Sequence, residues 1–99
     1  MSASTSAYQV LELTLKNGRI GTSEFDNKRE VIEYLVSFVV ENRQYDKEYI
    51  GDDNDAEYDE LVHSMGFKEL AAVAMQIGRR RLMKQGSGIV AVIQGHVVG

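Results

Sequence analysis

An apolar segment at residues 28–43 constrains the fold of this chain more than any other feature. Its sequence is KREVIEYLVSFVVENR, and a spacing of three and four positions places one set of apolar residues on a single helix face: Val31, Leu35, Phe38 and Val39. Three more apolar residues widen this face: Ile32, Val36 and Val40. A helix with so broad an apolar surface needs cover from more than one side. We therefore expect a sheet on one flank and another helix or a second subunit on the other.

The start of this segment carries a helix signal. Asn27 and Glu30 have the spacing of a capping box, in which each side chain bonds to the backbone N–H of the other residue. Residues 34–40 are rich in Tyr, Phe and Val, which also favour strands. The capping box and the length of the periodic run favour the helix over the strand.

A β-hairpin is predicted ahead of this helix. From Tyr8 onward the residues alternate with period two, which is typical of a strand. The two faces carry Leu11, Leu13 and Leu15 on one side and Val10, Glu12 and Thr14 on the other. Asn17-Gly18 follows, a dipeptide typical of a two-residue type I′ turn, so residues 19–25 form the return strand. The predicted cross-strand pairs are Leu15 with Ile20 and Val10 with Phe25. Gly21 could mark a bulge or a close backbone approach.

Two helices and a strand are predicted in the second half of the chain. Asp55 can cap a short helix over residues 56–65, which ends at Gly66, and a longer helix spans residues 67–84. The two could equally form one helix kinked near Gly66. A strand is predicted over residues 88–98, which are apolar on both faces through Ile93, as expected in the middle of a sheet.

The resulting order of elements is a β-hairpin, two to three helices and a C-terminal strand. This order predicts a small two-layer α+β domain over residues 7–99, preceded by a flexible tail at residues 1–6. Helices on one face of a three-stranded sheet would leave Val90 and Val92 exposed on the other face. We therefore expect a homo-oligomer that covers this second face.

Composition excludes several classes of protein. The 99 residues include no cysteine, which excludes disulfides, thiolate nucleophiles and cysteine metal sites. The net charge of −4 argues against a general nucleic-acid binder. The N-terminus lacks the basic and apolar regions of a signal peptide, and no apolar run reaches the roughly 18 residues needed to span a bilayer. We expect an intracellular, cytoplasmic protein without membrane contact.

Residues 46–60 concentrate the acidic charge, with eight carboxylates against one lysine. Like charges at this density repel one another unless something basic meets them. A solvated loop that keeps the protein soluble is one interpretation. The other is a surface that steers a basic protein partner, with tyrosines as contact anchors. The residues predicted for this surface are Tyr45, Asp46, Glu48, Tyr49, Asp52, Asp53, Asp55, Glu57 and Tyr58.

No metal, cofactor or catalytic site is predicted. Residues 46–57 match several positions of a calcium-binding loop, but Ile50 at the fifth position removes a ligand. Glu60 and His63 are one helical turn apart, whereas a metal site needs three or four ligands, so an ion-paired surface histidine is the simpler interpretation. Nothing in the spacing of the His and Ser residues supports a nucleophile with its base, so we expect a protein that is not an enzyme.

A basic run ends the third predicted helix and offers an alternative site, for the phosphate of a nucleotide or nucleic acid: Arg79, Arg80, Arg81 and Lys84. Phosphate sites place glycines before a helix N-terminus. Here Gly86 follows a C-terminus, where it is a natural helix end and where positive charge suits the helix dipole.

Together these features predict a small acidic protein-binding domain of the inhibitor or adaptor type, such as a phage or mobile element could encode. The expected partner is a protein with a basic surface. A nucleotide or nucleic acid, bound by the basic run, is the alternative.

Overall fold

The computed structural model describes residues 7–49, 51 and 55–95 of the chain. Its elements are β1 (Tyr8–Thr14), β2 (Arg19–Phe25), α1 (Lys28–Glu41), the short 3-10 helix η1 (Arg43–Tyr45), α2 (Asp55–Ser64), α3 (Phe67–Gln85) and β3 (Ser87–Gln94). The predicted α+β fold, with its hairpin, helices and C-terminal strand, is confirmed. The predicted flexible tail at residues 1–6 and the end of the predicted last strand, residues 96–98, lie outside the described residues.

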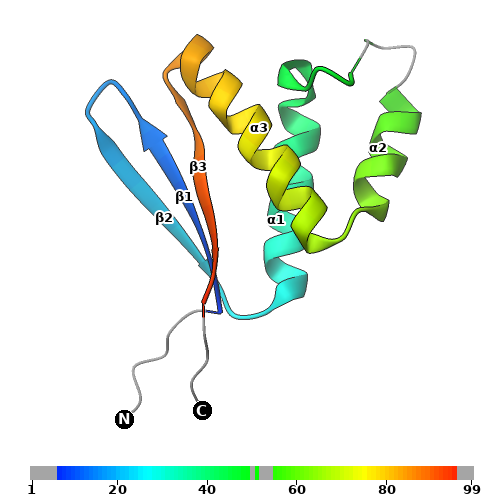
Figure 1. Ribbon diagram of the computed structural model, residues 1–99, viewed down its shortest axis with the longest axis horizontal. Coiled ribbons are helices and arrows are strands. Elements are labelled where there is room, and N and C mark those ends of the chain that lie inside the picture. Colours follow the sequence, from blue (N-terminus) through cyan, green and yellow to red (C-terminus); the bar gives the residue numbers. More distant parts are fainter. Residues whose placement is uncertain (1–6, 50, 52–54, 96–99) are drawn as a thin grey trace.

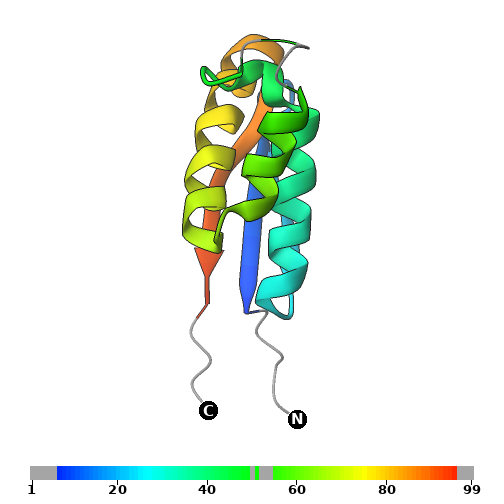
Figure 2. The same ribbon diagram turned by 90° about the vertical axis from the view of Figure 1, so that its right-hand side faces the viewer.

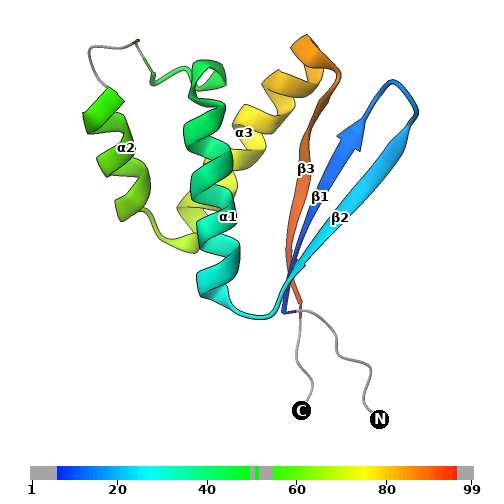
Figure 3. The ribbon, with the colours of Figure 1, turned by 180° about the vertical axis from the view of Figure 1, so that it is seen from behind.

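All three α-helices lie on one side of the sheet. The strands are antiparallel in the order β2-β1-β3, and α1 and α3 form a layer against them (Figure 1). In the view from the helical side, α2 lies as an outer layer over α1 and α3 (Figure 2). Seen from behind, the helices remain on that side, so no described element covers the opposite face of the sheet (Figure 3).

Helix α1 supplies the centre of the core, and the helix prediction is confirmed. Its predicted inward residues are all buried: Val31, Leu35, Phe38 and Val39. They belong to one core with buried residues of the sheet and of α3: Val10, Leu70, Ala74, Ile77 and Ile89. Asn27 caps the helix as predicted, because its Oδ1 accepts the backbone N–H of Glu30 at 2.9 Å. The return contact joins the two side chains, Asn27 Nδ2 to Glu30 Oε2 at 3.0 Å, instead of reaching the backbone.

The hairpin forms, but its predicted register is wrong by two residues. Ile20 lies opposite Leu13, and Phe25 lies opposite Tyr8. The turn takes four residues, 15–18, instead of the two that were expected. β1 therefore ends at Thr14, two residues earlier than a two-residue turn requires, while β2 begins at Arg19 as predicted. This shifts every cross-strand pair by two residues.

The four-residue turn follows from the backbone of Asn17. A type I′ turn needs positive φ at both central residues, and no non-glycine residue in the described part of the chain has positive φ. Gly18 alone supplies it in this turn, with φ of 66°. The Asn17 side chain instead accepts the backbone N–H of Arg19 at 3.0 Å, which stabilises the wider turn.

The predicted role of Gly21 is also wrong. The pairing of β1 with β2 runs unbroken through Glu12 and Gly21, and a Cβ on Gly21 would meet nothing within 4 Å. The close backbone approach lies between α3 and β3. A Cβ on Gly78 would lie 2.6 Å from the carbonyl oxygen of Ile89, and a Cβ on Gly88 would overlap the backbone of Gly78. Two residues without a Cβ thus allow the helix to lie directly on the strand.

β3 is an edge strand, so the prediction of a central position is wrong. β1 lies in the middle because both other strands pair with it. Leu11 of β1 lies opposite Ala91, and Glu12 lies opposite Ile89. A bulge in β3 thus leaves Val90 without a paired position. Beyond the bulge, Val92 packs against the core, contrary to the expectation that it is exposed. Val90 is half-buried.

α2 and α3 are separate helices, so the alternative of one kinked helix is wrong. Gly66 is extended, with φ of −79° and ψ of 175°, and is the N-cap of α3. Gly86 ends α3 in the left-handed region with φ of 81°, and its N–H donates to the carbonyl of Leu82. The prediction that Gly86 ends this helix is confirmed.

We predict that Gly78→Ala lowers the free energy of unfolding by about 1–3 kcal/mol, because the new methyl group forces α3 away from β3. Urea unfolding followed by circular dichroism measures the change. Gly21→Ala is the matched control, since a Cβ there meets nothing within 4 Å, and its unfolding free energy should stay within about 0.5 kcal/mol of the wild type. Equal stability of the two variants would contradict the close packing of α3 on β3.

Candidate functional site

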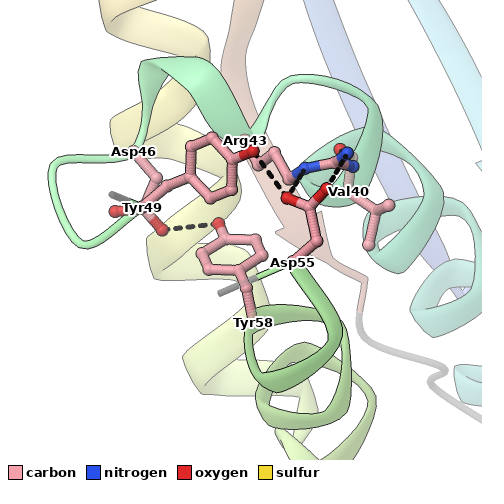
Figure 4. Close-up of polar contacts among 6 residues, drawn as sticks. All are labelled: Val40, Arg43, Asp46, Tyr49, Asp55 and Tyr58. Atoms are coloured by element: carbon pink, nitrogen blue, oxygen red, sulfur yellow. Dashed lines mark hydrogen bonds and ion pairs between the residues drawn. The ribbon is translucent and has the colours of Figure 1, made fainter. Parts of the chain in front are cut away.

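Tyr58 and Asp46 form a buried hydrogen bond between α2 and the segment that precedes it. The side chains are 4% and 8% exposed, and the Tyr58 hydroxyl donates to Asp46 Oδ2 at 2.6 Å (Figure 4). Asp46 Oδ1 accepts the backbone N–H of Glu48 at 3.0 Å. Because both carboxylate oxygens have a donor, the buried charge is compensated and residues 46–48 are held against α2.

A second group lies beside this pair and is centred on Asp55, the first residue of α2. Arg43 donates from Nε to Asp55 Oδ1 at 3.2 Å and from Nη2 to Asp55 Oδ2 at 3.4 Å, and from Nη1 to the carbonyl of Val40 at 2.9 Å. The Tyr49 hydroxyl donates to the same Asp55 Oδ1 at 2.5 Å (Figure 4). The rings of Tyr49 and Tyr58 meet edge to face at 5.5 Å, which joins the two groups.

These contacts keep the tyrosine hydroxyls protonated. Burial is the largest cause that raises the pKa of Tyr58, followed by its hydrogen bond to Asp46. The hydrogen bond to Asp55 raises the pKa of Tyr49, and the hydrogen bond to Tyr49 raises the pKa of the Arg43 guanidinium. Both hydroxyls therefore act as hydrogen-bond donors that hold carboxylates in place.

The expectation that the tyrosines of this segment are exposed contact anchors differs from the structure, which buries Tyr45 and Tyr58. Tyr45 is 8% exposed and Tyr58 is 4% exposed, and both belong to the hydrophobic core. Asp46 is buried with them, and the carboxylate of Asp55 is half-buried and paired with Arg43. The cause is tertiary contact, since both rings join the core cluster and η1, which carries Tyr45, contacts α3.

The remaining predicted residues have other positions. Glu48 and Glu57 are exposed, and Tyr49 is half-buried. Asp52 and Asp53 lie outside the described residues, as does Ile50. The predicted partner surface is thus reduced, within the described part of the chain, to Glu48, Glu57 and the edge of Tyr49.

Glu48 and Glu57 border a pocket of about 440 Å³ on the outer side of α2. Tyr58 and Leu61 also line it, and Leu61 is 54% exposed. Among the described residues, the lining contains two carboxylates and no lysine or arginine. The spacing of Leu61 from Tyr58 and Val62 places all three on one side of the helix. Only the position of α2 in the fold decides that Leu61 points outward while the other two are buried.

The basic run does not form one site. Arg79, Arg80 and Lys84 are exposed, whereas Arg81 turns inward with its guanidinium 3.6 Å from Glu12 and over the ring of Phe38 at 5.9 Å. Arg81 borders a pocket of about 330 Å³ that also contains Glu12 and Glu41. Two carboxylates at this position would repel a phosphate group. The fold therefore does not bring the four cations together around one phosphate.

Metal ligands and membrane helices were also sought within residues 7–49, 51 and 55–95. In this part of the chain no group of three or more His, Cys, Asp or Glu side chains could hold a metal ion. His63 is exposed, and its Nδ1 lies 2.7 Å from the carbonyl oxygen of Asp59 in its own helix. None of the described helices is both long enough and apolar enough to cross a membrane.

We predict that Tyr58→Phe lowers the free energy of unfolding by about 1–3 kcal/mol, because Asp46 keeps its buried charge but loses a donor. Tyr34→Phe is the control, since the Tyr34 ring packs on Phe25 and the described residues provide no hydrogen bond for its hydroxyl. Urea unfolding at neutral pH compares the two variants with the wild type. Equal losses in both would show that the Asp46 contact adds nothing beyond ring packing.

A second prediction concerns alkaline pH. The pKa of Tyr58 in the folded protein lies above its ordinary value of 10.0. Above about pH 10 the unfolded chain ionises this tyrosine while the folded protein keeps the proton, so stability falls as pH rises. Between about pH 9 and pH 11 the wild type should lose about 1 kcal/mol more unfolding free energy than Tyr58→Phe loses. Urea unfolding at both pH values measures this difference. Tyr34→Phe is the control variant. Equal losses of unfolding free energy in the wild type and in Tyr58→Phe would contradict a raised pKa of Tyr58.

No protein-family model, curated protein or solved structure matches this chain. The geometry of its own surface is therefore the basis for a functional proposal.

Proposed function

We propose that this chain is a protein-binding domain without catalytic activity, and that it recognises a basic side chain of its partner at the pocket on α2. The observation that carries the proposal is the lining of this pocket. Glu48 and Glu57 stand there beside the apolar surface of Leu61, and none of the described lining residues is a lysine or arginine. We define these three residues together with Tyr58 as the α2 pocket.

The chemistry of the α2 pocket fits a lysine or arginine. Such a side chain has an apolar stem that can lie along Leu61 and a charged end that can reach the carboxylates of Glu48 and Glu57. The cavity of about 440 Å³ is large enough for one long side chain of this kind. A planar guanidinium can bind a carboxylate through two hydrogen bonds, which favours arginine over lysine as the inserted residue.

The surroundings of the pocket favour binding without large rearrangement. Tyr58 forms part of the lining and is fixed by its hydrogen bond to Asp46. Glu48 is positioned by its backbone N–H, which bonds to the same carboxylate. A side chain that finds its carboxylates already in place loses less entropy on binding than one that has to order a loop.

The charge of the whole chain supports the same type of partner. A net charge of −4 attracts basic surfaces over distances of about a Debye length, roughly 8 Å at physiological salt, and raises the rate of encounter. We assign the chain to the inhibitor or adaptor class for this reason, and the lack of cysteine suits the reducing cytoplasm. No observation gives comparable support to phosphate binding by the basic run, since Arg81 is directed away from the other cations.

We predict that the double variant Glu48→Gln, Glu57→Gln loses at least about tenfold in partner capture. The matched control is Asp26→Asn, Glu69→Gln, which changes the net charge by the same amount at exposed positions outside the α2 pocket. Proteins captured from a nuclease-treated lysate of the native host are compared by quantitative mass spectrometry. Equal loss in both variants would reduce the effect to overall charge and contradict a local site.

A defined probe tests the chemistry of the pocket directly. N-acetyl-arginine amide, titrated into the labelled protein and followed by NMR, should shift the backbone amides of Glu48, Glu57 and Leu61. The shifts should be absent in the Glu48→Gln, Glu57→Gln variant and should weaken with added salt. Shifts of equal size over the whole acidic surface would contradict recognition at the α2 pocket.

A further inference from the structure

The face of the sheet that points away from the helices is apolar. Along β1, Val10 points into the core with 1% exposure, so Leu11 and Leu13 point to the opposite side, as does Gln9 near the end of the strand. Residues paired across the strands share a face, which adds residues from β2 and β3. We define the open sheet face as Leu11, Leu13, Ile20, Thr22, Ala91 and Ile93.

This face lacks cover from the described part of the chain. α1, α2 and α3 all lie on the other side of the sheet (Figures 1 and 3). Ile20 is 58% exposed and Ile93 is 41% exposed, whereas Ile89, which points to the helices from the same strand as Ile93, is 1% exposed. Large apolar side chains gathered on one exposed face are typical of a surface that binds another protein.

We propose that the open sheet face is a homodimer interface, in which two copies of this chain stack their sheets face to face. Apolar faces of antiparallel sheets pack about 10 Å apart, with their strands rotated by about 30°. Branched side chains on both faces interdigitate in such a contact. A twofold axis through the face brings the same residues together from both copies, so no second type of surface is required.

Charge favours a second copy over a basic partner at this face. Each copy carries a net charge of −4, so two copies repel unless they meet where charge is sparse. The six residues of the open sheet face carry no charge, and Glu24 is the one carboxylate on the adjoining part of the same face of β2. The basic partner proposed for the α2 pocket would find no pair of carboxylates among the six residues of the open sheet face.

The area of the face is sufficient for a reversible dimer. Strands about 4.8 Å apart and residues about 3.3 Å long give three seven-residue strands a projected area of about 330 Å². Side-chain relief raises the accessible area to roughly 500 Å² per copy, so that a dimer buries roughly 1,000 Å² in total. Interfaces of this size belong to weak assemblies, and we expect a monomer–dimer equilibrium at micromolar concentrations.

The two surfaces can operate together because they lie on opposite sides of the domain. α2 is the layer farthest from the sheet (Figures 1 and 3), so a sheet-to-sheet dimer leaves both α2 pockets open. Such a dimer would present two sites for basic side chains and gain avidity for a partner with two of them. The dimer itself does not depend on the function proposed for the α2 pocket.

Sedimentation equilibrium over a concentration series tests the proposal. The wild type should change from the monomer mass of 11.1 kDa toward twice that value as concentration rises. Ile20→Lys, Ile93→Lys places charges on the open sheet face and should weaken the dimer at least about tenfold. Met83→Lys is the matched control, because Met83 is 81% exposed on α3 and should leave the equilibrium unchanged. Circular dichroism confirms that each variant is folded.

A second measurement keeps the face intact and uses the absence of cysteine in the chain. Thr22→Cys adds one thiol to the open sheet face, and Met83→Cys adds one elsewhere. Under mild oxidation the Thr22→Cys protein should form a covalent dimer at least about tenfold faster than Met83→Cys. A wild type that stays monomeric at every concentration would overturn the proposal, even if it bound lipid vesicles or another protein through this face. The proposal would also be overturned if the double variant Ile20→Lys, Ile93→Lys stayed dimeric and the Thr22→Cys and Met83→Cys proteins formed covalent dimers at equal rates. That result would point to the edge of β3 as the interface.

Discussion

The broad apolar surface of α1 is the constraint on which the rest of this domain depends. Val31, Leu35 and Val39 are fully buried, and burial of each such side chain contributes about 1.5–3 kcal/mol. One neighbour cannot cover so wide a surface. The sheet and α3 cover one part of it, and α2 covers another from the outside, where Ile32 and Val36 lie near His63 of α2. The order of the layers therefore follows from α1.

The contact of α3 with β3 decides which side of the sheet remains open. Gly78 and Gly88 allow this helix to lie directly on the strand that follows it in the chain. Because α1 occupies the same side, every described helix lies on one side of the sheet (Figure 1). The apolar side chains of the opposite face and the acidic α2 pocket thus lie at the two ends of one stack of layers, and the two proposals concern separate surfaces.

The acidic segment has a different role in the fold from the one that its sequence suggests. As a sequence it is a dense run of like charge, which destabilises a chain unless cations are near. In the fold, Arg43 neutralises Asp55, and Tyr58 and a backbone N–H satisfy Asp46. Part of the segment is therefore internal structure. Glu48, Glu57 and Glu60 are the described carboxylates that remain exposed, and the first two border the pocket.

The sequence by itself determined the type and order of the elements, because local chemistry decides them. The periodicity of α1, the cap at Asn27 and the left-handed residue at Gly86 act within a few residues of chain and were correctly predicted. The four-residue turn was missed because the Asn17 side chain stabilises a backbone without positive φ.

Tertiary structure alone decided the surfaces. The central position of β1, the inward direction of Tyr45 and Tyr58 and the exposure of Leu61 depend on which elements meet across the fold. Such contacts join residues that are far apart in the chain, and the spacing of residues along one segment does not encode them. The candidate site and the open sheet face are for this reason properties of the packed domain.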